Sequence, residues 1–158
     1  GQQTGKSEWM SAWSAHTIVA NQFLASYQMM SRIEIDRLMR EFYAARKRGD
    51  LDAVCRSFSP DARFQIASAN EASPVAIKAS GVGEFRPLLA LLIKTFKLGD
   101  LMISAMTVDG SQATVHWQAD VRSSITGATV PTELVDLVEI RDGYIVNFNE
   151  VFVRRANA

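Results

Sequence analysis

Residues 42–64 read FYAARKRGDLDAVCRSFSPDARF, and this stretch decides the fold. Gly49 ends a helical pattern, because glycine readily adopts the conformation that closes a helix. Asp50 then caps a short helix, whose apolar residues recur at helical spacing: Leu51, Val54, Cys55 and Phe58. Residues 61–69 alternate as a strand. The stretch is therefore predicted to lead from a helix, through a tight turn, into a sheet.

Two helical patterns precede this turn. Residues 32–47 place apolar side chains on one side of a helix, and residues 8–30 form an earlier amphipathic pattern of mostly large apolar residues: Trp9, Trp13, Ala20, Phe23 or Leu24, Tyr27 and Met30. We expect residues 1–31 to be a helical extension that packs across a dimer or covers a pocket. The main domain is expected over residues 32–155.

The second half of the chain changes period. Residues 70–83 look like a turn, and residues 84–99 predict a helix with Pro87 in its first turn. Four strands then follow, separated by turns at Asp109-Gly110, Thr126-Gly127 and Asp142-Gly143. Helices followed by a meander predict an α+β domain with a curved, mostly antiparallel sheet wrapped around packed helices.

Composition excludes several function classes. The 158 residues are 47% hydrophobic, which suits one domain with a sizeable core. Lys and Arg number 17, as do Asp and Glu, so no net field points to nucleic acid or an anionic membrane surface. No run reaches the roughly 18 apolar residues of a membrane span. We therefore expect no nucleic-acid or membrane partner.

Metal and disulfide chemistry are also not expected. Cys55 is the single cysteine and reads as a buried thiol, while His16 and His116 lack the spacing of a metal site. The sequence thus predicts no metal and no cofactor. The sequence begins with Gly1 instead of Met, so a secretory signal could have been removed. We expect the cytoplasm by default and keep secretion as the alternative.

The order of elements resembles a known superfamily. Residues 42–64 look like the helix, turn and strand entry of the NTF2-like, or cystatin-like cone, proteins, and VEIRDGYIVNFNEVF, residues 138–152, resembles their closing hairpin. The resemblance implies a conical sheet with an apolar pocket between helices and strands. Ketosteroid isomerases, epoxide hydrolases and SnoaL-like polyketide cyclases share this fold, which does not fix a function.

The isomerase branch matches poorly at its catalytic positions. Ile66 stands where the isomerases carry their base in the first strand, and Phe42 stands where they carry a helix Tyr. Tyr43 is adjacent but points about 100° further round the helix. Only Asp136 matches, at the position of the Asp that binds the enolate oxygen. Asp120 and Arg122 match part of the spacing of the Asp-Arg-Asp relay of the epoxide hydrolases, but they lie on the polar face of their strand.

The cyclase branch matches better. The resemblance to the cyclases implies that a carboxylate in the last strand, Glu150 in this chain, is the acid/base group. At the position of Asp136 the cyclases carry a His, so this chain departs from them there. By the two-residue period of strands, Asp136 and Glu150 can share the concave face of one hairpin. Two carboxyls in an apolar pocket should not both ionise, so the pKa of one is expected to be raised. Alternatively, Asp136 is a solvated strand residue, and Glu150 pairs with Arg122, Arg154 or Arg155.

The pocket is expected to be lined by apolar and aromatic residues. In residues 113–121 the odd positions are apolar, so Trp117 faces the core, as a filler or a ligand platform, and His116, Gln118 and Arg122 face outward toward a possible second subunit. The predicted substrate-binding residues are Phe42, Tyr43, Phe64, Ile66, Phe85, Trp117, Val138, Phe148 and Phe152.

Two function classes follow from these residues. The first is a SnoaL-like enzyme of unknown substrate that uses Asp136 and Glu150, without a cofactor, on a small hydrophobic carbonyl compound, as an isomerase, cyclase or dehydratase. The second is a ligand-binding or dimeric scaffold module that has lost the first-strand base. In both cases we expect a small hydrophobic ligand and a homodimer through the sheet face.

Overall fold

The computed structural model describes residues 4–68 and 77–153. Three helices and six strands follow one another in the chain: α1 (Thr4–Arg48), α2 (Leu51–Arg56), β1 (Phe58–Ser68), β2 (Ile77–Ser80), α3 (Val82–Thr95), β3 (Phe96–Asp109), β4 (Gln112–Ser123), β5 (Thr129–Arg141) and β6 (Tyr144–Val153). The strands form one curved, open sheet in the order β2-β1-β6-β5-β4-β3. β1 and β6 pair in parallel and the other neighbours pair antiparallel, so the predicted α+β cone is confirmed.

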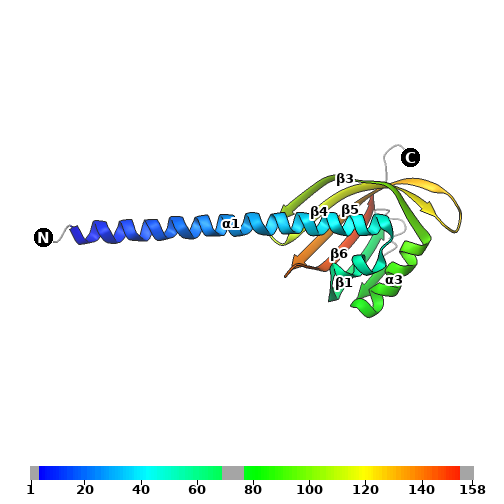
Figure 1. The fold of residues 1–158 in the computed structure, drawn as a ribbon, viewed down its shortest axis with the longest axis horizontal. Helices are drawn as coiled ribbons and strands as arrows, with labels where there is room; N and C mark the ends of the chain where they lie inside the picture. Colours follow the sequence, from blue (N-terminus) through cyan, green and yellow to red (C-terminus); the bar gives the residue numbers. More distant parts are fainter. Residues whose placement is uncertain (1–3, 69–76, 154–158) are drawn as a thin grey trace.

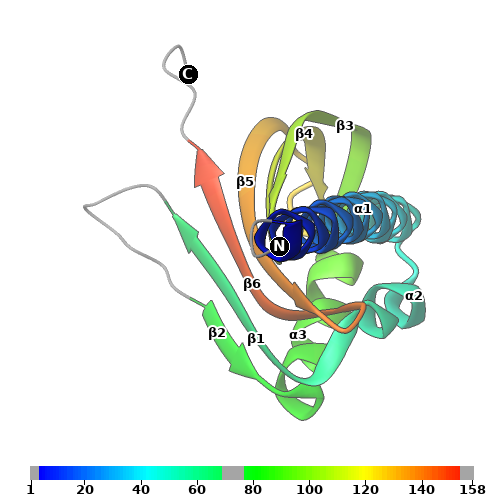
Figure 2. The ribbon, with the colours of Figure 1, turned by 90° about the vertical axis from the view of Figure 1, so that its left-hand side faces the viewer.

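The sheet wraps around the second half of α1. Figure 2, viewed nearly along this helix, shows α1 in the hollow of the sheet with α2 and α3 at one side. Buried residues of α1, among them Met39 and Phe42, face buried residues of the concave sheet surface, among them Val115 and Phe148. The odd positions of β4 face this core as predicted, and His116 is exposed on the opposite face.

α1 is one continuous helix, which corrects the expectation of two helices over residues 8–30 and 32–47. It has 45 residues, and between Gly5 and Gly49 the sequence has no glycine or proline to end it. Its first half projects away from the domain (Figure 1). The projecting half therefore does not cover the interior of its own cone.

The turn after α1 forms as predicted. Gly49 has φ 71°, and the Asp50 side chain accepts a hydrogen bond from the Ala53 N–H at 3.0 Å, which caps α2. At the β5–β6 hairpin, Asp142 and Gly143 have φ 51° and 80°, the left-handed conformation that a two-residue hairpin turn requires. These turns fix where α1 and β6 enter the site.

Three boundaries differ from the expectation. The segment predicted as a turn contains β2, a short strand that pairs with β1, while residues 69–76 lie outside the described part of the chain. α3 begins at Val82, so Pro87 lies inside the helix instead of in its first turn. β3 begins at Phe96 and continues through Gly99, where its pairing with β4 shifts register.

Candidate functional site: a buried carboxyl pair

Asp136 and Glu150 lie opposite each other on β5 and β6. Their Cα atoms are register partners, and their exposed fractions are 0% and 2%. The hairpin turn alone does not produce this register. Arg141 pairs with Tyr144 and Ile140 with Ile145, but Glu139 pairs with Asn147, so β6 holds one extra residue. This bulge turns Glu150 to the concave face beside Asp136, and the predicted placement of the two acids is thereby confirmed.

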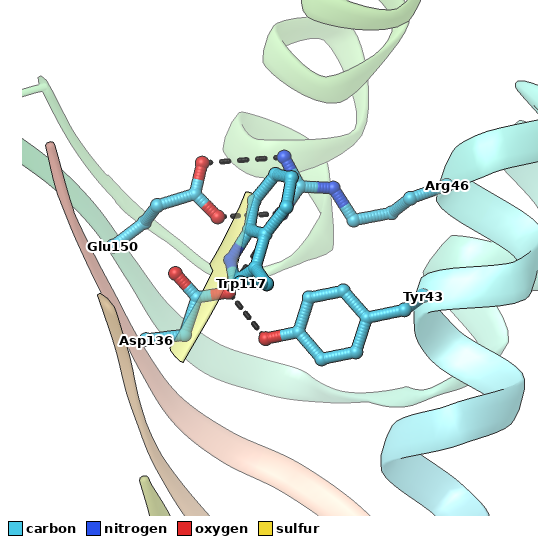
Figure 3. Close-up of polar contacts among 5 residues, drawn as sticks. All are labelled: Tyr43, Arg46, Trp117, Asp136 and Glu150. Carbon is cyan, nitrogen blue, oxygen red and sulfur yellow. Dashed lines mark hydrogen bonds and ion pairs between the residues drawn. The ribbon is translucent and has the colours of Figure 1, made fainter. Parts of the chain in front are cut away.

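The two oxygens of the Asp136 carboxyl have different surroundings. Oδ2 accepts a hydrogen bond from the Tyr43 hydroxyl and a second one from Trp117 Nε1 at 2.8 Å (Figure 3). Oδ1 is buried and has no hydrogen-bond partner among the described residues. A buried polar atom without a partner is costly, and such atoms need an explanation.

Glu150 forms an ion pair with Arg46 of α1. The guanidinium donates to Oε2 at 2.5 Å and to Oε1 at 3.2 Å, and its Nη1 lies 3.9 Å from Asp136 Oδ2. The guanidinium carbon lies 4.8 Å from the centre of the Trp117 ring, within cation–π distance. The side chain of Arg46 is 16% exposed and that of Glu150 is 3% exposed, so Arg46 forms the outer edge of the site.

Burial and neighbouring charge set the protonation of the site. Burial raises the pKa of Asp136 well above its ordinary value, the Glu150 carboxylate raises it further, and Arg46 opposes both effects. Burial, followed by the Asp136 charge, raises the pKa of Tyr43. Burial disfavours the charge of Arg46, but Glu150 outweighs it, and the pKa of Arg46 lies above its usual value. The site therefore favours the protonated form of the Asp136 carboxyl.

The predicted lining residues separate into two groups. Phe42, Phe64, Phe85 and Phe148 join Phe58 in an aromatic core, in which Phe64 stacks on Phe148 at 5.5 Å between ring centres. The others lie at or next to the carboxyl pair: Tyr43 and Trp117 donate to Asp136, Ile66 is the β1 register partner of Glu150, Val138 follows on β5, and Phe152 follows on β6. Phe152 is 39% exposed and the other residues named here are buried.

Sequence reasoning missed Arg46 and misjudged Tyr43. The resemblance placed Phe42 at the position of the isomerases' helix Tyr, but in the structure Phe42 packs on Phe148 and Tyr43 donates a hydrogen bond to Asp136. Arg46 lies three residues after Tyr43, and residues three apart share a helix face. That spacing was the available signal. The alternative partner Arg122 is exposed, whereas Arg154 and Arg155 lie outside the described residues.

Residues 4–68 and 77–153 contain neither a cluster of metal ligands nor a membrane-spanning helix. Within these ranges, no three His, Cys, Asp or Glu side chains gather as metal ligands. No helix of this part is long and apolar enough to cross a membrane. Asp120 and Arg122, the partial match to an epoxide hydrolase relay, lie on β4 one position out of phase with Trp117 and hence on the opposite face.

The family follows from comparison with known proteins. The SnoaL-like domain model matches residues 39–148, which include α1 from Met39 and the strands up to Phe148. The chain belongs to the SnoaL-like family. No protein with a curated description is significantly similar to this SnoaL-like chain.

Solved structures support the fold of the SnoaL-like domain. A candidate isomerase from Bacillus subtilis has a TM-score of 0.66 at 20% identity, over 76% of this chain and 86% of its own. An LEH-like epoxide hydrolase from M. tuberculosis has 0.61 at 17%, over 77% and 84%. A Xanthomonas campestris protein of unknown function with a cystatin-like fold has 0.62 at 20%, over 77% and 91%. At these identities the similarity establishes the NTF2-like fold and no activity.

Proposed function

We propose that this SnoaL-like protein is a cofactor-free acid/base enzyme that acts on a small hydrophobic carbonyl compound. The observation that carries the proposal is the Asp136 carboxyl, which is fully buried beside Glu150 and has one oxygen without a hydrogen-bond partner among the described residues. Buried carboxyls with strongly raised pKa values cluster at functional sites. The reaction type is that of an isomerase, cyclase or dehydratase.

Asp136 is suited to the role of the acid. Because Oδ2 already accepts hydrogen bonds from Tyr43 and Trp117, the proton of the neutral carboxyl belongs on Oδ1. A carboxyl held neutral in an apolar site can donate a hydrogen bond to a carbonyl oxygen and stabilise the negative charge that develops there. The proton on Oδ1, which can form a hydrogen bond to Glu150 when no ligand is bound, thus supplies the donor that an enolate needs.

Glu150 is suited to the role of the base. In the proposed step, Glu150 takes a proton from the carbon next to the substrate carbonyl, and the electron pair moves to the carbonyl oxygen that Asp136 binds. Return of the proton to another carbon completes an isomerisation. In a ring closure, the enolate carbon attacks a second carbonyl carbon of the same substrate, and the proton held by Glu150 passes to the alkoxide oxygen that this bond formation leaves. Directly paired strand residues lie about 4.5–5.5 Å apart at Cα, so one functional group of a substrate can contact both carboxyls.

The ligand is proposed to enter beside Arg46 and Phe152. These side chains are partly exposed, whereas the apolar side chains of Ile66, Trp117 and Val138 are buried. A small apolar molecule in contact with these residues would have its carbonyl oxygen near Asp136. The aromatic core would hold the site in shape; it includes Phe42, Phe64, Phe85 and Phe148.

A second candidate is ligand binding without chemistry. The observation that favours it is Ile66, which is the β1 neighbour of Glu150 and cannot transfer a proton. In that case the carboxyl pair has only a structural role. A homodimer through the outer sheet face is compatible with either candidate, because His116, Arg122 and Leu137 are exposed there.

Hydrogen–deuterium exchange into simple ketones tests the proposed chemistry. We would incubate the protein in D2O with cyclohexanone and with 3-cyclohexen-1-one, and follow deuterium incorporation and double-bond migration by NMR. Glu150→Gln should remove at least about 99% of the catalysed exchange, since a positioned base contributes roughly 10²–10⁴-fold. The control is Glu139→Gln, the same change at a part-buried position on the opposite face of β5. Full activity of Glu150→Gln would contradict the proposal, and binding of the ketones with no exchange would favour the second candidate.

A further inference from the structure

The projecting half of α1 exposes a set of large apolar side chains. Residues 11–27 are all exposed, and the following members have 54–72% of their surface in solvent: Trp13, Val19, Phe23, Leu24 and Tyr27. Globular domains rarely leave contiguous apolar surface of this kind uncovered, and such surface marks an interaction site. Isolated helices are also marginal in water unless an amphipathic face packs on something.

Three of the exposed residues, Trp13, Leu24 and Tyr27, continue the face that α1 buries in its own domain. At 100° per residue, Trp13, Ala20, Leu24 and Tyr27 fall within an arc of about 60°. Leu38 and Phe42, which pack in the core, fall in the same arc. We call the residues Trp13, Ala20, Leu24 and Tyr27 the outer stripe. Its surface is an extension of a packing face, and the domain ends before covering it (Figure 1).

We propose that the outer stripe pairs antiparallel with the outer stripe of a second copy of this chain, with the two-fold axis near Ala20. Trp13 and Tyr27 lie seven residues before and after Ala20, so in this arrangement Trp13 packs on Tyr27 of the partner subunit. His16 likewise meets Leu24 of the partner subunit. The small side chain of Ala20 lets the two backbones approach at the axis. A two-fold axis requires such self-complementary spacing.

Charge favours a second copy as the occupant. Residues 9–31 contain no Asp, Glu, Lys or Arg, so two such helices meet without repulsion and a strongly charged partner finds no complement. The antiparallel direction also brings opposite ends of the two helix dipoles together. A neutral, apolar, self-complementary stripe is what an isologous interface needs.

A groove at the base of α1 favours the antiparallel direction. The groove has a volume of about 950 Å³ and lies between α1 and two hairpin turns; its lining includes Tyr27, Ser31, Ile35, Leu38, Gly110 and Gly143. In the proposed register, residues 5–9 of the partner's helix lie opposite Ser31 and Ile35 and so fall on this groove. A parallel pair would leave both grooves without an occupant.

The outer stripe supplies most of the area that a stable dimer needs. Its large side chains, Trp13, Leu24 and Tyr27, offer roughly 400 Å² per copy, or roughly 800 Å² for the pair. Specific protein interfaces bury at least about 1,200 Å² in total. Contacts of the two helix tips with the two grooves would supply the remaining area.

Sedimentation equilibrium of the whole chain tests the pairing. Leu24→Glu places a charge in the outer stripe and should raise the dissociation constant at least about 100-fold, since each dimer loses two buried leucines. Ile18→Glu is the matched control, because Ile18 is exposed to nearly the same extent (56% against 54%) and lies about 120° round the helix from Leu24. The control should change the constant less than about threefold.

Each alternative result overturns the proposal. A wild-type chain that sediments as a monomer at 100 μM or so has no such interface, and a monomer that floats with phosphatidylcholine vesicles uses the stripe for lipid instead. Assembly that is equally strong in wild type and Leu24→Glu belongs to another surface, such as the sheet face. One further result would support the proposal: if the sheet face also forms a dimer, Leu24→Glu should halve the number of subunits in the assembly.

Disulfide crosslinking tests the direction. In a Cys55→Ser background, His16→Cys and Leu24→Cys chains are oxidised separately and as a mixture. The antiparallel pair predicts that the mixture forms a 16–24 disulfide at least about tenfold faster than either variant crosslinks to itself. Faster self-crosslinking of each variant would mean a parallel pair and would overturn the antiparallel arrangement.

Discussion

Replacement of Arg46 by methionine should lower the free energy of unfolding far more than replacement of an exposed arginine on the same helix. Arg46→Met keeps the apolar stem but leaves Glu150, 3% exposed, without its two charge-assisted hydrogen bonds. The contact of the guanidinium with the Trp117 ring is lost as well. Removal of one partner of a buried ion pair typically costs about 3–5 kcal/mol, because the remaining charge is left uncompensated. Partial exposure of Arg46 lets water reach the site, so we expect the lower end, about 3 kcal/mol.

The same helix provides a matched control. Arg40 pairs with Asp36 at 2.8 Å, but both side chains are about half exposed, so Arg40→Met should cost less than about 0.5 kcal/mol. The free energy of unfolding would be measured by urea titration with far-UV circular dichroism at fixed protein concentration. In the double variant Arg46→Met/Glu150→Gln, the loss should be smaller than the sum of the two single losses by about 2 kcal/mol. Equal costs for Arg46→Met and Arg40→Met would refute this description of the site.

Two further predictions concern Asp136. Tyr43→Phe keeps the ring packing but removes one donor to Oδ2, so the free energy of unfolding should fall by about 1–2 kcal/mol in urea titrations; an unchanged value would mean that the hydroxyl does not serve Asp136. Because the pKa of Asp136 is higher in the folded than in the unfolded chain, its contribution is full below about pH 4 and is lost as pH rises through the folded pKa, by up to about 1.4 kcal/mol per pH unit. The stability of the wild type relative to Asp136→Asn should therefore decrease between pH 5 and pH 8, and a constant difference would contradict the raised pKa.

Local signals predicted the elements whose ends carry strong turn chemistry. Gly49-Asp50 and Asp142-Gly143 sit where the structure needs positive φ or a cap, so the turn between α1 and α2 and the β5–β6 hairpin could be predicted from residue type alone. β2 could not, because four residues carry too little periodicity and the strand depends on pairing with β1. The continuity of α1 was missed because residues 8–30 and residues 32–47 were interpreted as two separate amphipathic patterns, although no glycine or proline between them stops a helix.

The site was predicted in part, and the missing part depends on long-range packing. The two acids were identified through the resemblance to the isomerases and cyclases, and strand period only allowed them to share a face. The bulge in β6 that turns Glu150 to the concave face has no local signature. Tyr43 and Arg46 share a helix face, yet which face points into the cone depends on how α1 rotates against the sheet. The resemblance to the isomerases placed Phe42, instead of Tyr43, at the position of their helix Tyr, and a difference of one position changes the direction of a side chain by about 100°.

A carboxyl-resolved NMR titration of Asp136 tests the central claim most directly. The carboxyl carbon would be followed from pH 3 to pH 9 in the wild-type protein, with Asp136→Asn to assign its signal and Glu150→Gln to remove the neighbouring charge. The account predicts a midpoint well above the value of about 3.9 for a free aspartate, and a lower midpoint in Glu150→Gln, since burial and Glu150 both raise the pKa. A midpoint at or below about 4 would contradict the account, because Asp136 would then carry a charge at neutral pH and have no proton to donate.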